Sequence, residues 1–581
     1  MNKNPLSLFR LLWGAGFLFF LLVPQVRADM DPKHLIDPRA FWHFSCALYA
    51  QQVGDADRAL VEFQQAARYD TKSSAIHDRM AYHYYVEGLD YKSVEELQKS
   101  KELAPNNIET RLLLANLLAS QGEYSKAQRE YLDILKIDPQ NVDARFYLAS
   151  ALANQNRTDE ALQQYQDILA LNPKSASVYY NMGLIYTRAN QATKAEEAFK
   201  KAIELDPNLE SAYTSLGLIY ELDQKPQDAI LAYQALVKVN PDNAQAYLAL
   251  GELFYNQKDD AKALEAFKNY SQLKPDDLTV NDYIGLCHLR LKQFPEAVES
   301  FQKLLEKQPA NALVRFRLAA AYEETKETDK AIEQLRAILV NDEKSVDAWV
   351  RLVILFDRAK NLKEALKTAQ EGLKAVPNSP DLLLMQAMLD HESNNFKQAE
   401  AGYRKVVDLE LALKNKQAAD YGAGTLSQAY FDLGSLLDKQ GKFNDAMDLM
   451  KKVLQLDPSN ADAYNYIGYS YADKGVQLDE AQKDIETALK IDPTNSYYMD
   501  SLGWVYYRRG KFQEAKALLD KALKALKTEQ KDDAAIYDHL GEVLLKMGQK
   551  DEALAQWQKA SKLDPDNKDY PEKIKKNNSV N

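Results

Sequence analysis

The strongest constraint on this chain is an alanine that recurs every 34 residues. It stands at 127, 161, 195, 229, 263, 297, 331, 365 and 399. Alanine is about one residue in ten in ordinary proteins, so nine consecutive matches at one period are not chance. Numbering this alanine as position 20 gives fifteen copies, which start at 40, 74, 108, 142, 176, 210, 244, 278, 312, 346, 380, 427, 461, 496 and 534. Such a period indicates a stack of similar units rather than several globular domains.

Three further positions keep register with the alanine. Position 8 is Gly or Ala in all copies but one, position 24 is large and apolar in most, and position 32 is Pro in eleven. A small residue facing a large one predicts two closely packed helices, and the proline ends the second of them. In the fifth copy, the apolar spacing predicts helices over Ala176–Tyr186 and Lys194–Leu205.

With Trp or Tyr at position 4 of several copies (Tyr179, Trp349 and Tyr464 among them), residues 40–567 resemble the tetratricopeptide repeat (TPR) family. The resemblance implies an all-α fold, an α-solenoid in which about fifteen helix-turn-helix repeats form a right-handed superhelix with a concave groove. The ends of such an array need caps. The candidates are residues 29–39 and the polar tail 568–581, which we expect to fray.

The array has one large interruption. Eleven repeats over 40–413 are followed by extra residues 414–426 and then by four repeats over 427–567. The extra segment is either a hinge or partner-specific loop, or a lengthened connection that the solenoid tolerates; the second reading is the simpler one, because longer loops cost little free energy.

Residues 1–28 have the pattern of a secretory signal peptide. A basic start precedes the apolar run Leu11–Val23, and Val26-Arg27-Ala28 provides a cleavage site. Thirteen residues rise about 20 Å as a helix, less than the roughly 30 Å hydrocarbon core, so a cleaved signal is favoured over a membrane anchor. We expect an exported protein without a stable membrane span, periplasmic or else outer-membrane associated or secreted. Its two cysteines, Cys46 and Cys287, are expected to be buried thiols.

Charge and motifs exclude several function classes. A net charge of −12 argues against nucleic acid and against anionic lipid surfaces. The sequence lacks a phosphate-binding glycine loop, a Gly-x-Ser-x-Gly elbow and a His-Glu-x-x-His pair. Its seven histidines are scattered, without the spacing of a metal site. We therefore expect no enzyme, no cofactor and no metal.

The resemblance also implies which residues line the groove, namely first-helix positions 2, 5, 9, 12 and 13. These positions hold eighteen acids and six bases, a nominal charge of 6 − 18 = −12. We expect a protein partner with a neutral or basic segment, bound more weakly at high salt. Family members that clamp a chaperone's C-terminal carboxylate use a basic residue at position 5; here no repeat has one, so that clamp is not expected.

Aromatic groove residues are the candidate partner-binding site. The richest aromatic stretch is in the fourteenth repeat. The candidate groove residues are Tyr180, Leu184, Tyr497, Asp500, Trp504, Tyr507 and Arg508. Aromatic anchors of this kind make binding hot spots. The alternative is that Trp504 only packs on the neighbouring hairpin.

Together these features favour a non-catalytic exported scaffold or adaptor for the assembly or processing of a cell-envelope complex. Residues 464–473 and 500–504 resemble the C-terminal repeats of exported bacterial TPR proteins, some of which are outer-membrane lipoprotein adaptors for periplasmic proteases. This chain lacks their lipid-bearing cysteine. A scaffold for polysaccharide synthesis or export and an unrecognised enzyme are the alternatives.

Overall fold

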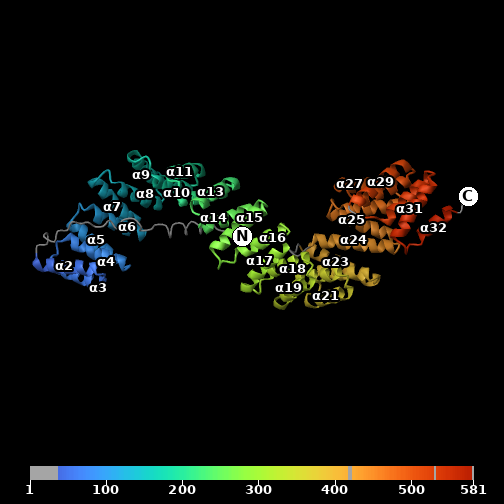
Figure 1. Cartoon of the computed structure of the whole chain (residues 1–581), viewed down its shortest axis with the longest axis horizontal. Coiled ribbons are helices and arrows are strands. Elements are labelled where there is room, and N and C mark those ends of the chain that lie inside the picture. Colours follow the sequence, from blue (N-terminus) through green and yellow to red (C-terminus); the bar gives the residue numbers. More distant parts are fainter. Residues whose placement is uncertain (1–36, 417–421, 529–530, 579–581) are drawn as a thin grey trace. The chain divides into compact units, whose positions relative to one another are not determined.

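The computed structural model describes residues 37–416, 422–528 and 531–578. The expected signal peptide 1–28 and most of the expected cap 29–39 lie outside these residues. The described part contains 31 helices and no strand, which confirms the α-solenoid. The chain divides into two units, residues 1–277 and 278–581. In each unit successive helices pair as hairpins (Figure 1).

Unit 1 contains seven hairpins: α2 (Pro38–Gln52), α3 (Ala56–Tyr69), α4 (Ser74–Val86), α5 (Asp90–Leu103), α6 (Ile108–Ser120), α7 (Tyr124–Ile137), α8 (Val142–Asn154), α9 (Thr158–Leu171), α10 (Ala176–Arg188), α11 (Ala192–Leu205), α12 (Glu210–Leu222), α13 (Pro226–Val239), α14 (Ala244–Asn256) and α15 (Asp260–Leu273).

Unit 2 contains eight hairpins and a last helix: α16 (Val280–Arg290), α17 (Phe294–Lys307), α18 (Ala312–Glu324), α19 (Thr328–Asn341), α20 (Val346–Arg358), α21 (Leu362–Ala375), α22 (Pro380–Glu392), α23 (Phe396–Asn415), α24 (Ala423–Lys439), α25 (Phe443–Leu456), α26 (Ala461–Lys474), α27 (Leu478–Ile491), α28 (Ser496–Arg508), α29 (Phe512–Thr528), α30 (Ala534–Lys546), α31 (Lys550–Leu563) and α32 (Asp569–Asn578).

The helices begin and end for local reasons that repeat with the period. Asn141 Oδ1 accepts a hydrogen bond from the Ala144 backbone N–H at 2.9 Å and caps α8, and Asn460 caps α26 in the same way. Position 15, in the turn between the two helices, has a positive φ in every copy, from Gly54 at 81° to Gln224 at 56°. Seven copies place glycine there, the residue that adopts this conformation at the lowest cost.

The core of each hairpin is the predicted small-to-large contact. All the alanines that define the period are fully buried. A Cβ atom added to Gly251 would lie 2.5 Å from the Phe267 ring, and one added to Gly541 would lie 2.6 Å from Trp557. Absence of a side chain therefore lets the two helices approach closely.

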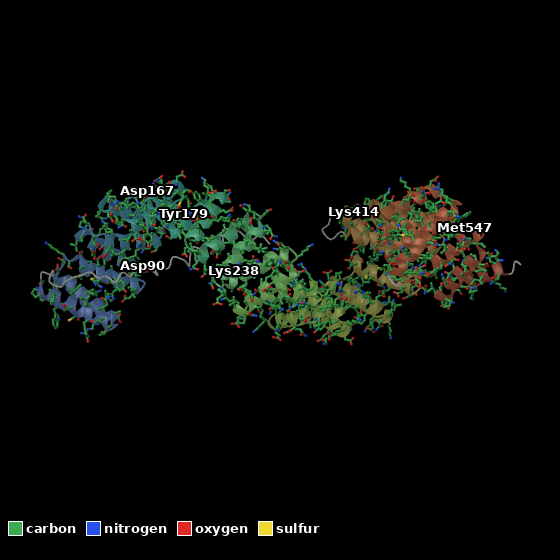
Figure 2. The ribbon with its side chains drawn as sticks, turned by 45° about the horizontal axis from the view of Figure 1, so that its top comes forward. Asp90, Asp167, Tyr179, Lys238, Lys414 and Met547 are labelled. Carbon is green, nitrogen blue, oxygen red and sulfur yellow. The ribbon has the colours of Figure 1, made fainter. Side chains whose placement is uncertain are left out.

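Polar side chains such as Lys238 and Lys414 extend into solvent (Figure 2).

The structure differs from the expected connection 414–426. The second helix of the eleventh repeat continues to Asn415, and the next helix already begins at Ala423. The buried carboxylate of Glu410 accepts a hydrogen bond from the Gly422 N–H at 2.8 Å, and Leu426 is buried. Six of the thirteen extra residues thus lengthen two helices, which pack as a pair.

The expected fraying of the tail is wrong for Asp569–Asn578, which form α32. Its Tyr570 is buried against the last hairpin, and its Lys573 pairs with Asp538 at 2.7 Å and Glu542 at 2.8 Å. Counted from residue 568, these are positions 3 and 6 of a sixteenth repeat. The helix thus takes the place of a next first helix and caps the array. None of the described helices is long and apolar enough to cross a membrane.

Candidate partner-binding surface

The first helices of the last three repeats, α26, α28 and α30, pack beside one another and carry the aromatic cluster. Trp504 stacks on Tyr507 with ring centres 4.6 Å apart and on His539 with ring centres 4.3 Å apart. Tyr469 lies 6.2 Å from the His539 ring. We call Tyr507, Trp504 and His539 the aromatic stack. It is half-buried at Trp504 and Tyr507.

A buried ion pair fixes the stack. His539 Nδ1 lies 2.9 Å from Asp500 Oδ1, and both residues are 7% exposed. Burial by itself would lower the pKa of His539, but the charge of Asp500 and its hydrogen bond outweigh burial and raise that pKa above its ordinary value. The indole Nε1 of Trp504 is buried and has no hydrogen-bond partner among the described residues, so its desolvation is not compensated within the chain.

The pairing of Asp500 with His539 follows a pattern that most acids at position 5 share and that was not predicted from the sequence. Of the four acids at this position, Asp78 accepts a hydrogen bond from Thr110 at 2.9 Å, whereas the other three pair with a base at position 6 of the next repeat. Besides Asp500 with His539, these are Asp282 with Arg317 and Asp538 with Lys573. Both of these pairs are 35 residues apart. The four residues 530–533 inserted before the last repeat increase the separation to 39 for His539, and aligning the repeats across this insertion would have found it.

Three of the predicted residues meet in or directly below the stack: Asp500, Trp504 and Tyr507. Tyr497 is 51% exposed and stays outside it. Arg508 donates from Nη1 to the backbone oxygen of Asp473 at 2.8 Å and so holds the end of α26. The contact of Trp504 with His539 confirms packing on the neighbouring hairpin, and its role in binding stays a prediction.

The other two candidates lie in unit 1. Tyr180 on α10 is half-buried, with its ring 5.7 Å from that of Phe199 on α11. Leu184, one turn further along α10, is also half-buried. The pair therefore fills part of its own hairpin, and its role in binding also stays a prediction.

Part of the acidity predicted for the groove is neutralised by bonds within the array. Glu323 accepts hydrogen bonds from Arg351 at 2.7 Å and from Arg358 at 3.2 Å. Arg351 is not among the six bases counted at the groove positions, and neither are Arg317 and Lys573, which pair with Asp282 and Asp538. The nominal count of −12 thus overstates the charge that a partner would meet.

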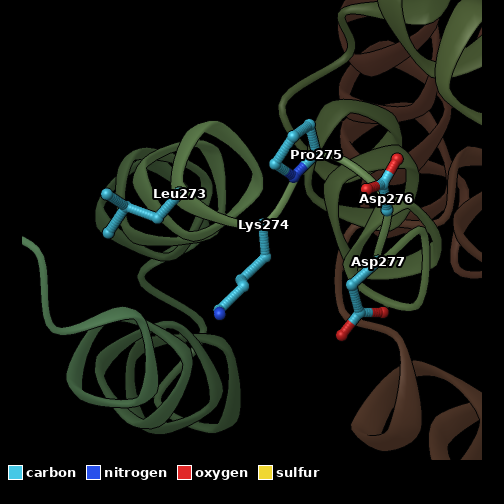
Figure 3. A pocket seen from close by; sticks show the side chains of 5 residues that line it. All are labelled: Leu273, Lys274, Pro275, Asp276 and Asp277. Atoms are coloured by element: carbon cyan, nitrogen blue, oxygen red, sulfur yellow. The ribbon is translucent and has the colours of Figure 1, made fainter. Parts of the chain in front are cut away.

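One hollow in the described part of the chain brings no separate functional groups together. A hollow of about 580 Å³ lies at the turn after α15 and is lined by Leu273, Lys274, Pro275, Asp276 and Asp277 (Figure 3). These are consecutive residues of one turn, so the hollow does not gather groups from separate elements. No group of His, Cys, Asp and Glu in the described ranges has the geometry to hold a metal ion.

Comparison with known families assigns the chain to one of them. Models described as "Tetratricopeptide repeat" match residues 112–176 and 327–380, 288–353, and 435–570. A "Cilia and flagella-associated protein 70 middle TPR-like domain" model matches residues 147–275. The chain belongs to the TPR family. TPR proteins are generally non-catalytic scaffolds that bind other proteins, and this defines the class.

Individual relatives add little. No curated protein matches. Yeast Tom70 is 17% identical, with 73% of this chain and 92% of Tom70 covered and a TM-score of 0.33. The APC/C hetero-tetramer Cut9–Hcn1 gives 14% identity, coverage of 82% and 98%, and a TM-score of 0.33. YrrB, described as a TPR protein with an unusual peptide-binding site, is 20% identical, with 32% of this chain and 95% of YrrB covered and a TM-score of 0.28. At these values we infer nothing about a partner.

Proposed function

We propose that this chain is an exported, non-catalytic scaffold or adaptor that binds a protein segment over the first helices of its last three repeats, in the assembly or processing of a cell-envelope complex. One observation supports this surface above others. The aromatic stack is half-exposed at Tyr507 and Trp504 and is held rigid by the buried Asp500–His539 pair. Aromatic side chains that are already ordered lose little entropy on binding and supply most hot spots.

The charge around the stack indicates the chemistry of the partner. Burial and the nearby carboxylates, Asp473 first among them, raise the pKa of Tyr469 to about 12. The positive charge of Lys573 offsets the negative charges of Asp538 and Glu542, with which it forms ion pairs. The carboxylate of Asp473, in contrast, is exposed to a partner. A neutral or basic segment fits this surface better than an acidic one, and the attraction weakens with salt.

Binding is tested by affinity capture from envelope extracts with the chain from Asp29 onward, comparing the parent with a Trp504→Ala/Tyr507→Ala variant. Trp349→Ala is the matched control: this tryptophan lies in another repeat and donates to the Glu343 backbone oxygen at 2.9 Å. We expect a partner that the parent and the control retain and the double variant loses at unchanged helix content. Equal capture by all three chains would contradict the proposed surface.

Export is supported by sequence alone, and a separate measurement tests it. The mature protein should begin at Asp29, which N-terminal mass analysis of protein purified from the native host reads directly. A chain that retains residues 1–28 in the cytoplasm would contradict export without bearing on the binding surface.

A further inference from the structure

The first helix of the array, α2, has an exposed apolar face. Trp42 is 66% exposed, Tyr49 61% and Val53 59%. Cys46 is half-buried between them, so the expectation of a buried thiol is wrong for this cysteine. These residues stand at i, i+4, i+7 and i+11, which places them along one side of a helix. We call them the α2 stripe.

The stripe is the surface on which each later hairpin packs against the one before it. Trp42 and Tyr49 are positions 3 and 10 of the first repeat, and in the other fourteen copies residues at these positions are at most 9% exposed. Within unit 1, for example, Val178 and Ile185 of α10 are 1% and 7% exposed, and α10 packs against α9 of the preceding hairpin. The same face is present on α2, but no hairpin among the described residues covers it.

A second copy joined head-to-tail would require an open last repeat. In this chain α32 occupies that end, with Tyr570 buried on the last hairpin. The two ends of the array therefore differ, and this favours a contact between two stripes over a head-to-tail contact.

The charge of α2 allows this arrangement. The only Lys, Arg, Asp or Glu of the helix is Arg39, which pairs with Asp37 at 2.8 Å and lies over the Tyr69 ring at 4.4 Å. His43 faces Glu62 at 2.7 Å. An uncharged stripe meets its own copy without like-charge repulsion, and two-fold pairs of this kind are the commonest oligomers.

We propose that the α2 stripe is a self-association interface, in which two copies pair α2 against α2 antiparallel about a two-fold axis close to Cys46. Trp42 and Tyr49 flank Cys46 at four and three residues. In the antiparallel pair, Trp42 of one copy therefore lies by Tyr49 of the other, and the two Cys46 thiols approach each other. Buried Trp and Tyr side chains are the usual anchors of such interfaces.

The test is sedimentation of the purified mature chain, together with thiol cross-linking. We expect twice the monomer mass at high concentration and reversion to monomer in Trp42→Glu at unchanged helix content. Val340→Glu, a change at an apolar residue that is 85% exposed elsewhere, should leave the dimer intact. Mild oxidation should join two chains through Cys46 and fail in Cys46→Ser, since Cys287 is fully buried.

Three results would overturn the proposal. One is a monomer at every concentration. If residues 29–36 of the same chain cover Trp42, this result is expected, and a fluorescence quencher would then fail to reach Trp42. Another is a dimer that Trp42→Glu leaves unchanged. The third is a dimer in which oxidation fails to join the Cys46 thiols.

Discussion

At the scale of single residues, position 8 decides how closely the two helices of a hairpin approach. Gly251→Val would push side-chain atoms into the Phe267 ring, which already lies 2.5 Å from the place of a Cβ atom. We expect a loss of about 1–3 kcal/mol in the free energy of unfolding. Adding Phe267→Ala should remove the clash, so the double variant should fall short of the sum of the two single losses.

Urea unfolding of the four chains measures this coupling. Gly424→Ala is the control, because a Cβ atom there meets no other atom within 4 Å. Strict additivity of Gly251→Val and Phe267→Ala would show that the two positions do not share a contact.

The buried pair below the aromatic stack predicts a pH dependence. Because the folded-state pKa of His539 is raised above 6.5, the stability it contributes is complete below pH 6.5 and is lost as the pH rises through the raised value. Asp500→Asn should cost about 1.5–3 kcal/mol at low pH and less at high pH. Urea midpoints of the parent and the variant across this range check the sign. A difference that grows with rising pH would contradict it.

The residue scale also shows where sequence reasoning ends. Asp500, Trp504 and Tyr507 could be predicted because they share one face of one helix. His539 was missed because its partner lies one repeat away, and the pairing becomes visible only when position 5 of the fourteenth repeat is aligned with position 6 of the fifteenth across the inserted residues. Tyr497 and Arg508 share the helix face but have other neighbours, since the face alone does not specify what packs against it.

At the scale of elements, the turn at position 15 offers a matched pair of changes. Lys292 has φ 58° and Gly510 has φ 76° at equivalent places. A left-handed conformation costs a residue with a Cβ about 1–2 kcal/mol. Lys292→Gly should therefore stabilise the array and Gly510→Lys should destabilise it, each by about 1 kcal/mol. Thermal unfolding measures both shifts. Shifts of the same sign would show that strain at this turn does not control stability.

Elements were predictable where the period holds. The hairpin boundaries follow from the alanine, the small-to-large pair and the proline, which act within one repeat. Residues 414–426 and the C-terminal segment lie outside the period, so their helical extension and the packing of α32 depend on contacts such as Glu410 to Gly422 and Tyr570 to the last hairpin. Tertiary contacts of this kind leave no periodic signal.

At the scale of the whole molecule, each hairpin packs only on its neighbours, which leaves much of the surface of a repeat array open to partners. What distinguishes one stretch of this surface from another is the local departure from the repeat. The aromatic stack of the last two repeats and the α2 stripe are two such departures. We propose partner binding at the first and self-association at the second.

The central claim is that a partner lies on the aromatic stack, and site-specific photo-cross-linking tests it most directly. A photoreactive phenylalanine analogue, which keeps an aromatic ring at the position, replaces Tyr507 in one chain. In another it replaces Lys524, an exposed residue on the second helix α29 of the same repeat. We predict a cross-linked protein from position 507 that is absent from position 524 and diminishes with salt. Cross-links from position 524 with none from 507 would contradict the account.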